Sequence, residues 1–187
     1  MVRSEAKPGG GTTWYVARPA GNFDLHTETW ACPEFLWSPE SAALAVTYSD
    51  GGLVGNYYIS VYRVTELEPA LIDVLAAVRS DFTSSYPKCY DTEEPNFGAV
   101  SWLDGSQHLL VAAEVLRHSN CDDAGTFALY EVSVPDGKII KKYDQLEAKR
   151  LFADKLGSEL SSANDDCIRK PGSCYIPELH KQDKPPH

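Results

Sequence analysis

Hydrophobic and polar positions alternate along much of the chain with the two-residue period of half-buried β-strands. The clearest example is residues 56–64, NYYISVYRV, in which positions 57, 59 and 61 oppose positions 58, 60 and 62. Residues 135–137, Pro-Asp-Gly, have the composition of a tight hairpin turn. The chain is therefore expected to be mainly β, with further strands, rich in β-branched and aromatic residues, at 13–18, 42–49, 98–103, 108–116, 126–134 and 138–143.

Two stretches carry the spacing of an amphipathic helix instead. In the first, Leu71, Leu75, Val78 and Phe82 fall on one face, with separations of four, three and four residues. Pro69 stands at a favourable first-turn position, because proline lacks the N–H that the first turn leaves unpaired. We expect a helix that begins near Pro69.

The second helix is predicted from its end signals as well as from its apolar face. Asp144 is a good N-cap, and Glu147 follows three residues later, the spacing of a capping box. Leu151 and Leu156 lie on the apolar side, and Gly157 supplies a C-terminal stop. This helix and the first should lie over the sheets.

An internal duplication is the most informative feature of the sequence. Residues 35–66 align with residues 99–138, and each copy reads as strand, tight turn, strand, long loop and strand. One such unit cannot bury both of its faces alone, so the copies are expected to stack as sheets. The alignment places Trp37 on Trp102, residues 38–41 on 103–106, Leu44 on Leu109 and Tyr62 on Tyr130.

The segments WSPESAALAV and SWLDGSQHLLV, each followed by a strand with a tyrosine near its end, resemble the repeat of WD40-like propeller proteins of the TolB type. That repeat has tryptophan or phenylalanine, then Ser-Pro-Asp-Gly, then an apolar strand. Glu40-Ser41 replaces Asp-Gly in the first copy, and Leu103 interrupts the Ser-Pro position in the second. Two or three repeats are too few for a ring of roughly 4–8 blades. The resemblance implies an incomplete, open β-propeller-like stack of antiparallel sheets with two short α-helices.

Length and composition indicate one domain at residues 12–180. The chain has 187 residues, and residues 1–11 and 181–187 are rich in Gly, Pro and Lys, so they are expected to be flexible tails. No apolar run approaches the about 18 residues of a membrane-spanning helix, and no leader precedes the domain. We therefore expect a chain without a membrane span, from which any export signal has been removed.

The charge balance excludes one class of partner. Seventeen Lys and Arg against 27 Asp and Glu give a formal charge of −10, the wrong sign for binding phosphate backbones. Nucleic acid is therefore not expected as a partner, and a basic protein is.

The five cysteines predict an oxidising compartment, because they lie in polar loop-like stretches where a bridge would join loops. Cys167 and Cys174 are seven residues apart around a Pro-Gly turn and form the favoured pair. Cys89 with Cys121 is a second candidate pair, which would leave Cys32 free. A zinc site is the alternative, but the chain has no Cys-x-x-Cys, so we expect no metal and no cofactor.

Candidate partner-binding residues lie in the two long loops at corresponding places in the repeats, which should emerge on the same rim. Long loops on a rigid sheet are where recognition usually resides. Leu53 and Val54 at one tip either contact a partner or fold back onto the body. The candidates are Asp50, Gly51, Gly52, Leu53, Val54, Gly55 and Asn56 in the first loop and Arg117, His118, Ser119, Asn120, Asp122 and Asp123 in the second.

The second loop also has two chemical interpretations. His118, Ser119 and Cys121 suggest a nucleophile, but residues so close in one loop rarely face a shared cleft, so no catalytic residue is assigned. The carboxylates at 91, 93, 94, 122 and 123 suggest either a calcium site or a face for basic side chains, and no twelve-residue calcium loop is present. A solvated acidic face is the plainer reading.

An acidic, exported, cysteine-bridged protein of this kind is similar to the periplasmic immunity proteins that neutralise peptidoglycan-cleaving effectors of type VI secretion. The resemblance implies a periplasmic or secreted inhibitor that plugs the cleft of a basic cell-wall hydrolase. The alternatives are a non-catalytic scaffolding or binding module of the cell envelope and, third, an unrecognised hydrolase.

Overall fold

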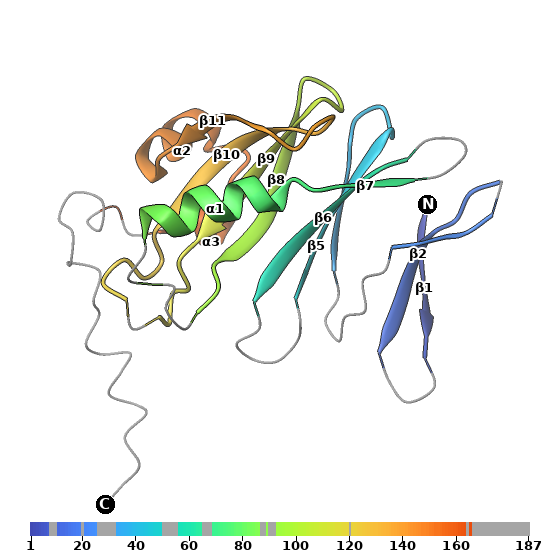
Figure 1. Ribbon diagram of the computed structural model, residues 1–187, viewed down its shortest axis with the longest axis horizontal. Helices are drawn as coiled ribbons and strands as arrows, with labels where there is room; N and C mark the ends of the chain where they lie inside the picture. Colours follow the sequence, from blue (N-terminus) through green and yellow to red (C-terminus); the bar gives the residue numbers. More distant parts are fainter. Residues whose placement is uncertain are drawn as a thin grey trace, which may run out of the picture.

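The computed structural model is built from three antiparallel β-sheets, placed side by side from the N-terminal end of the chain to the C-terminal helices (Figure 1). The mainly β expectation is therefore confirmed, and the described strands form no closed barrel. The structure describes residues 1–7, 11–19, 21–25, 33–49, 56–64, 69–86, 89, 93–119, 121–163 and 165.

The first sheet contains a strand that the sequence did not predict. Residues 1–11 were expected to be a flexible tail, but Val2–Ala6 form strand β1, and Val2 pairs with Val16 of the neighbouring strand. Val2 also packs against an apolar cluster, so the pairing and the contact together order a segment of weak intrinsic preference. The sheet consists of β1, β2 (Thr12–Val16) and β3 (Phe23–Asp24).

The two other sheets have four strands each and the same plan, in which every strand pairs with its neighbours in sequence. Both sheets are therefore antiparallel meanders with the same strand order. The middle sheet contains β4 (Glu34–Trp37), β5 (Ala43–Ser49), β6 (Tyr57–Arg63) and β7 (Ala70–Ile72). The third sheet contains β8 (Asn96–Leu103), β9 (His108–Glu114), β10 (Phe127–Ser133) and β11 (Ile139–Tyr143).

The strand registers confirm one half of the repeat alignment and correct the other. Trp37 pairs with Leu44 as Trp102 pairs with Leu109. Tyr62, however, lies opposite Leu44, whereas the residue opposite Leu109 is Val132. The match of Tyr62 with Tyr130 was therefore wrong by two residues. A shift of two keeps the side chain on the same face, which is why the hydrophobic pattern concealed it.

Three apolar clusters join consecutive layers. Leu44 and Val46 face the first sheet in one cluster, and the equivalent Leu109 and Val111 face the middle sheet in the next. The opposite face of β9, which includes Leu110, packs against the C-terminal helices. Equivalent residues of the middle and third sheets therefore face the preceding layer.

Helix α1 (Leu75–Ser85) begins later than predicted. Leu71 belongs to strand β7 and is 65% exposed, while Val78 and Phe82 are fully buried between the sheets. The Asp73 carboxylate accepts hydrogen bonds from the N–H groups of the first turn, at Leu75 and Ala76, which fixes the start of the helix.

Helix α2 (Gln145–Phe152) begins as predicted, with Asp144 Oδ1 accepting a hydrogen bond of 2.8 Å from Glu147 N. Gly157 was expected to terminate this helix, but it is the N-cap of a further helix, α3 (Ser158–Ser161). Ala148 of α2, Leu160 of α3 and Leu156 of the connection between them pack against the outer face of the third sheet. This segment covers the apolar outer face of that sheet.

The hairpin turn between β10 and β11 is confirmed. Gly137 has a φ of +69° and donates its N–H to the Ser133 carbonyl at 2.8 Å. A Cβ on Gly137 would lie 2.1 Å from the carbonyl oxygen of Asp73, so this turn also fits closely against the connection that leads into α1.

Candidate functional site

The two equivalent tight turns of the repeats touch each other at one edge of the stack. Ser106 Oγ lies 2.8 Å from Ser38 Oγ and also bonds to the Glu40 carboxylate. Trp102 Nε1 donates a hydrogen bond of 3.0 Å to the Leu36 carbonyl. These contacts hold the middle and third sheets in parallel alignment, so the opposite ends of their strands must also meet at one edge.

The long loops leave the sheets at that opposite edge. Tyr57, at the end of the first loop, donates its N–H to Asn96 Oδ1 at 3.1 Å, and Asn96 pairs with Glu114 at the start of the second loop. Candidate residues Asp50–Gly55 and Asn120 lie outside the described residues, while Asn56 is half-buried. We call this edge the loop edge, defined by Asn56, Tyr57, Asn96, Glu114 and residues 115–126 other than Asn120.

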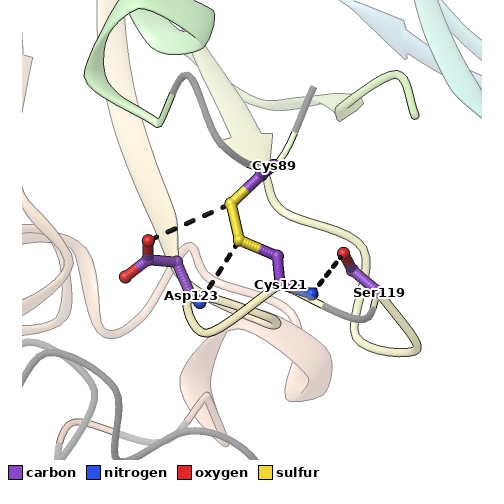
Figure 2. Close-up of a disulfide and its surroundings, with 4 residues drawn as sticks. All are labelled: Cys89, Ser119, Cys121 and Asp123. Carbon is purple, nitrogen blue, oxygen red and sulfur yellow. Dashed lines mark hydrogen bonds between the residues drawn. A yellow bond between two sulfur atoms is a disulfide. The ribbon is translucent and has the colours of Figure 1, made fainter. Parts of the chain in front are cut away.

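A disulfide between Cys89 and Cys121 ties the second loop to the segment that follows α1 (Figure 2). The two Cα atoms are 5.2 Å apart. Asp123 lies against the bridge, with its N–H 3.5 Å from Cys121 Sγ and its carboxylate 3.9 Å from Cys89 Sγ. Ser119 Oγ accepts a hydrogen bond of 3.0 Å from Cys121 N. The predicted pairing is therefore present; Cys32, Cys167 and Cys174 lie outside the described residues.

The disulfide excludes the thiol chemistry that the sequence suggests for this loop. Cys121 is not a free thiol, and Ser119 is 4% exposed with its hydroxyl bonded to the backbone, so neither residue is presented as a nucleophile. The two sulfurs and the Asp123 carboxylate lie within 4.8 Å of one another, but sulfurs joined in a disulfide are not thiolate ligands. The loop is built as a rigid surface, and it exposes Arg117, His118 and Asp122.

Arg117 connects the loop edge to α3. Its Nε lies 3.0 Å from Glu114 Oε1 and 3.3 Å from Glu159 Oε1, and its guanidinium also donates to the Glu159 carbonyl. Glu114 is 6% exposed, and its burial raises the pKa of the carboxyl, partly offset by the bond to Arg117. Glu114 and Glu159 resemble the carboxylate pair of a hydrolase, but Arg117 lies between them and makes them an ion-pair network that holds α3.

An open cleft of about 560 Å³ adjoins this network. Its floor is the outer face of β8 and β9, where Gly98 pairs with Ala112, and one wall is the segment that leads from α2 into α3. The opposite wall comes from the ends of the middle-sheet strands. The lining residues are Glu34, Thr47, Tyr48, Ser49, Tyr57, residues 96–100, Ala112, Glu114, Lys155 and residues 157–160.

The carboxylates expected to gather beside the second loop have different roles. Glu94 forms an ion pair with Arg79 of α1, Asp123 lies at the disulfide, and Asp122 is exposed. Asp91 lies outside the described residues. The loop edge is thus acidic but partly neutralised, and the remaining negative charge faces solvent near Asp122 and the cleft.

Sequence reasoning missed two groups of residues. One is the cleft, although Gly98 inside a predicted strand and Glu114 at the end of an apolar run were visible signals. The other is a network on the outer face of the third sheet, where Glu131 accepts from Tyr143 and pairs with His108 Nδ1 at 2.8 Å. These three residues come from three strands, so only the sheet register brings them together.

No helix in the described part of the chain is both long enough and apolar enough to cross a membrane. Comparisons of the chain with protein-family models, with curated proteins and with solved structures find no match.

Proposed function

We propose that this protein is an exported binding protein whose loop edge docks onto a basic protein partner. Most concretely, it is an immunity protein that blocks the active site of a cell-wall hydrolase effector. The observation that supports this proposal is the disulfide-braced loop 115–126, which meets the flank of the equivalent loop at one edge of two stacked repeats. A preorganised surface loses little conformational entropy on binding.

The compartment and the charge support the same proposal. A disulfide persists in an oxidising environment, which suits a periplasmic or secreted protein. The formal charge of −10 speeds encounter with a basic enzyme and repels other acidic proteins. The stacked sheets act as an open, propeller-like frame that presents the loop edge.

A peptidoglycan digestion assay tests this function. The product of a neighbouring gene that encodes an exported amidase is mixed with whole peptidoglycan, with and without this protein in stoichiometric excess. We expect full protection from digestion. Unchanged digestion, together with no binding by calorimetry, would contradict the inhibitor proposal.

A pair of charge reversals locates the docking surface. Asp122→Lys places a positive charge on the loop edge, whereas Glu5→Lys makes the same change in net charge on exposed β1. Asp122→Lys should weaken binding about tenfold, mainly through slower association that depends on salt, and Glu5→Lys should have little effect. Equal effects would show that only net charge matters.

The second candidate is a scaffolding module of the cell envelope, which the stack of repeated sheets also favours. It predicts a captured envelope protein that is bound at the same edge without any loss of hydrolytic activity in the digestion assay.

A further inference from the structure

We propose that the cleft beside the loop edge receives a lysine or arginine side chain of the partner, presented on an extended segment. This inference rests on the proposed function for the identity of the occupant, but binding at the cleft can be tested with small probes alone. The acidic docking surface would then include one defined contact with the partner.

The floor of the cleft has open space above Gly98, because glycine has no side chain. A Cβ built on Gly98 would meet no atom within 4 Å, and the residue has no positive φ. Neither backbone conformation nor packing therefore requires glycine there, although glycine weakens a strand interior. What glycine supplies at this position is open space, next to the small side chain of Ala112.

The end of the cleft carries an acceptor suited to a cation. Glu114 is 94% buried, and its Oε1 is bonded to Arg117, but no described residue donates a hydrogen bond to its Oε2. A buried carboxylate gains most from a second positive partner, because the low dielectric strengthens their attraction.

The charge of the lining favours a cationic occupant over an anionic one. Glu34, Glu114 and Glu159 line the cleft, and the only cation among the described lining residues is Lys155, whose Nζ lies 3.7 Å from Asp154 Oδ2. Arg117 is held by two of these carboxylates. The surroundings of the incoming charge are therefore negative on balance.

The size and shape of the cleft favour a side chain with its adjoining backbone. Its volume of about 560 Å³ lies within the roughly 300–1,000 Å³ of small-ligand pockets. The methylene stem of lysine or arginine would lie over Gly98 and Ala112, near Leu160, while the charged end reaches Glu114. Tyr57, a lining residue that is 49% exposed, carries a hydroxyl suited to the peptide backbone.

The experiment uses three probes of similar size: N-acetyl-arginine amide, N-acetyl-lysine amide and the uncharged N-acetyl-norleucine amide. Titrations of the whole protein are followed by NMR chemical shifts. We expect the two cationic probes to bind with dissociation constants on the order of 1 mM, and norleucine amide to bind at least tenfold more weakly.

Two variants test whether the probes bind in the cleft. Gly98→Ile fills the cleft with a residue that strands favour, so it should abolish probe binding while the melting temperature stays equal or rises. Glu114→Gln keeps the shape and removes the charge, and should weaken cation binding about tenfold. Their controls, Thr13→Ile on β2 and Glu5→Gln on β1, make comparable changes far from the cleft and should leave binding unchanged.

Equal binding of all three probes, or wild-type binding by a folded Gly98→Ile variant, would overturn the inference. If a partner binds Gly98→Ile and the wild type equally, the cleft is not part of the interface, and the proposed function is unaffected. If Gly98→Ile abolishes probe binding but the protein inhibits no hydrolase, the cleft is a cation site, and the proposed function is wrong.

Discussion

The middle and third sheets share a strand plan and differ in the links that hold their described residues. In the third sheet, the loop between β9 and β10 is tied by the Cys89–Cys121 bridge and by Arg117, and the outer face is covered by α2 and α3. In the middle sheet, Ser49 and Tyr57, the described residues that flank the equivalent loop, pair with each other, and Tyr57 also donates a hydrogen bond to Asn96 of the third sheet. Among the described residues, the same strand plan therefore carries a covalent link in the third sheet, at the loop between β9 and β10.

The two sheets also differ in the apolar surface around them. The cluster between the middle and third sheets includes residues of both sheets and of α1, such as Val61, Phe82 and Val111. Among the described residues, the cluster between the first and middle sheets has fewer buried members, which include Leu44, Val46 and Tyr62. We therefore expect stability to be concentrated around the third sheet.

The largest expected effect comes from truncating equivalent core leucines. Leu109→Ala should lower the free energy of unfolding by about 3–5 kcal/mol, and Leu44→Ala by about 2–3 kcal/mol, because the larger cluster leaves the larger cavity. Both side chains are fully buried. Urea unfolding followed by fluorescence measures both values, and equal losses would argue against a stability gradient between the sheets.

Removing the bridge should loosen the loop between β9 and β10. The double variant Cys89→Ser, Cys121→Ser opens a link between residues 32 apart, which should cost about 3–4 kcal/mol. Amide hydrogen exchange should rise in residues 115–126 and stay unchanged at the turn that contains Ser106. Uniform acceleration across the third sheet would show that the bridge stabilises the whole sheet and not the loop.

Two turn glycines provide a smaller and more local comparison. Gly137→Ala forces a Cβ to within 2.1 Å of the Asp73 carbonyl oxygen, whereas Gly105→Ala meets the flexible Glu40 side chain at 2.4 Å. Both positions have positive φ, so each alanine should cost at least about 1 kcal/mol. Gly137→Ala should cost about 1–2 kcal/mol more. Thermal unfolding of the two variants measures which substitution costs more stability. Equal costs would mean that the backbone before α1 shifts easily to accommodate the added Cβ.

The smallest expected effect is a pH dependence in the same hairpin. The hydrogen bond from Lys138, followed by that from Ser133, lowers the pKa of Asp136 from 3.8 to about 2. A lowered pKa in the folded state adds stability above pH about 4, and this stability is lost as the pH falls through about 2. The difference in melting temperature between wild type and Asp136→Asn should therefore shrink between pH 4 and pH 2. The pair is exposed, so high salt should also reduce the difference.

Residue patterning predicted the features that depend on neighbours in sequence. The strand around Tyr62 follows from alternation, the strand around Leu110 follows from its apolar composition, and the start of α2 follows from Asp144. In each of these cases a short segment contains both the cause and the effect. The pairing of Cys89 with Cys121, which are 32 residues apart, follows instead from loops that flank the same predicted strands.

The features that were missed depend on contacts between distant segments. Val2–Ala6 has little strand preference and becomes a strand because β2 offers a free edge. Leu71 matched a helical stripe, but pairing with Tyr62 places it in a sheet. The cleft needs Gly98 and Glu159 from separate elements. No local pattern records such contacts.

The meander order of the sheets has a consequence for biosynthesis. Because every described strand pairs only with strands adjacent to it in the chain, each sheet can form as soon as its own residues have emerged. Growth from the N-terminal end would place one completed layer after another, each offering its apolar face to the next. The last step is the closure of the outer surface by α2 and α3, so a ribosome-bound intermediate that lacks them would expose Leu110 and Phe127 to chaperones.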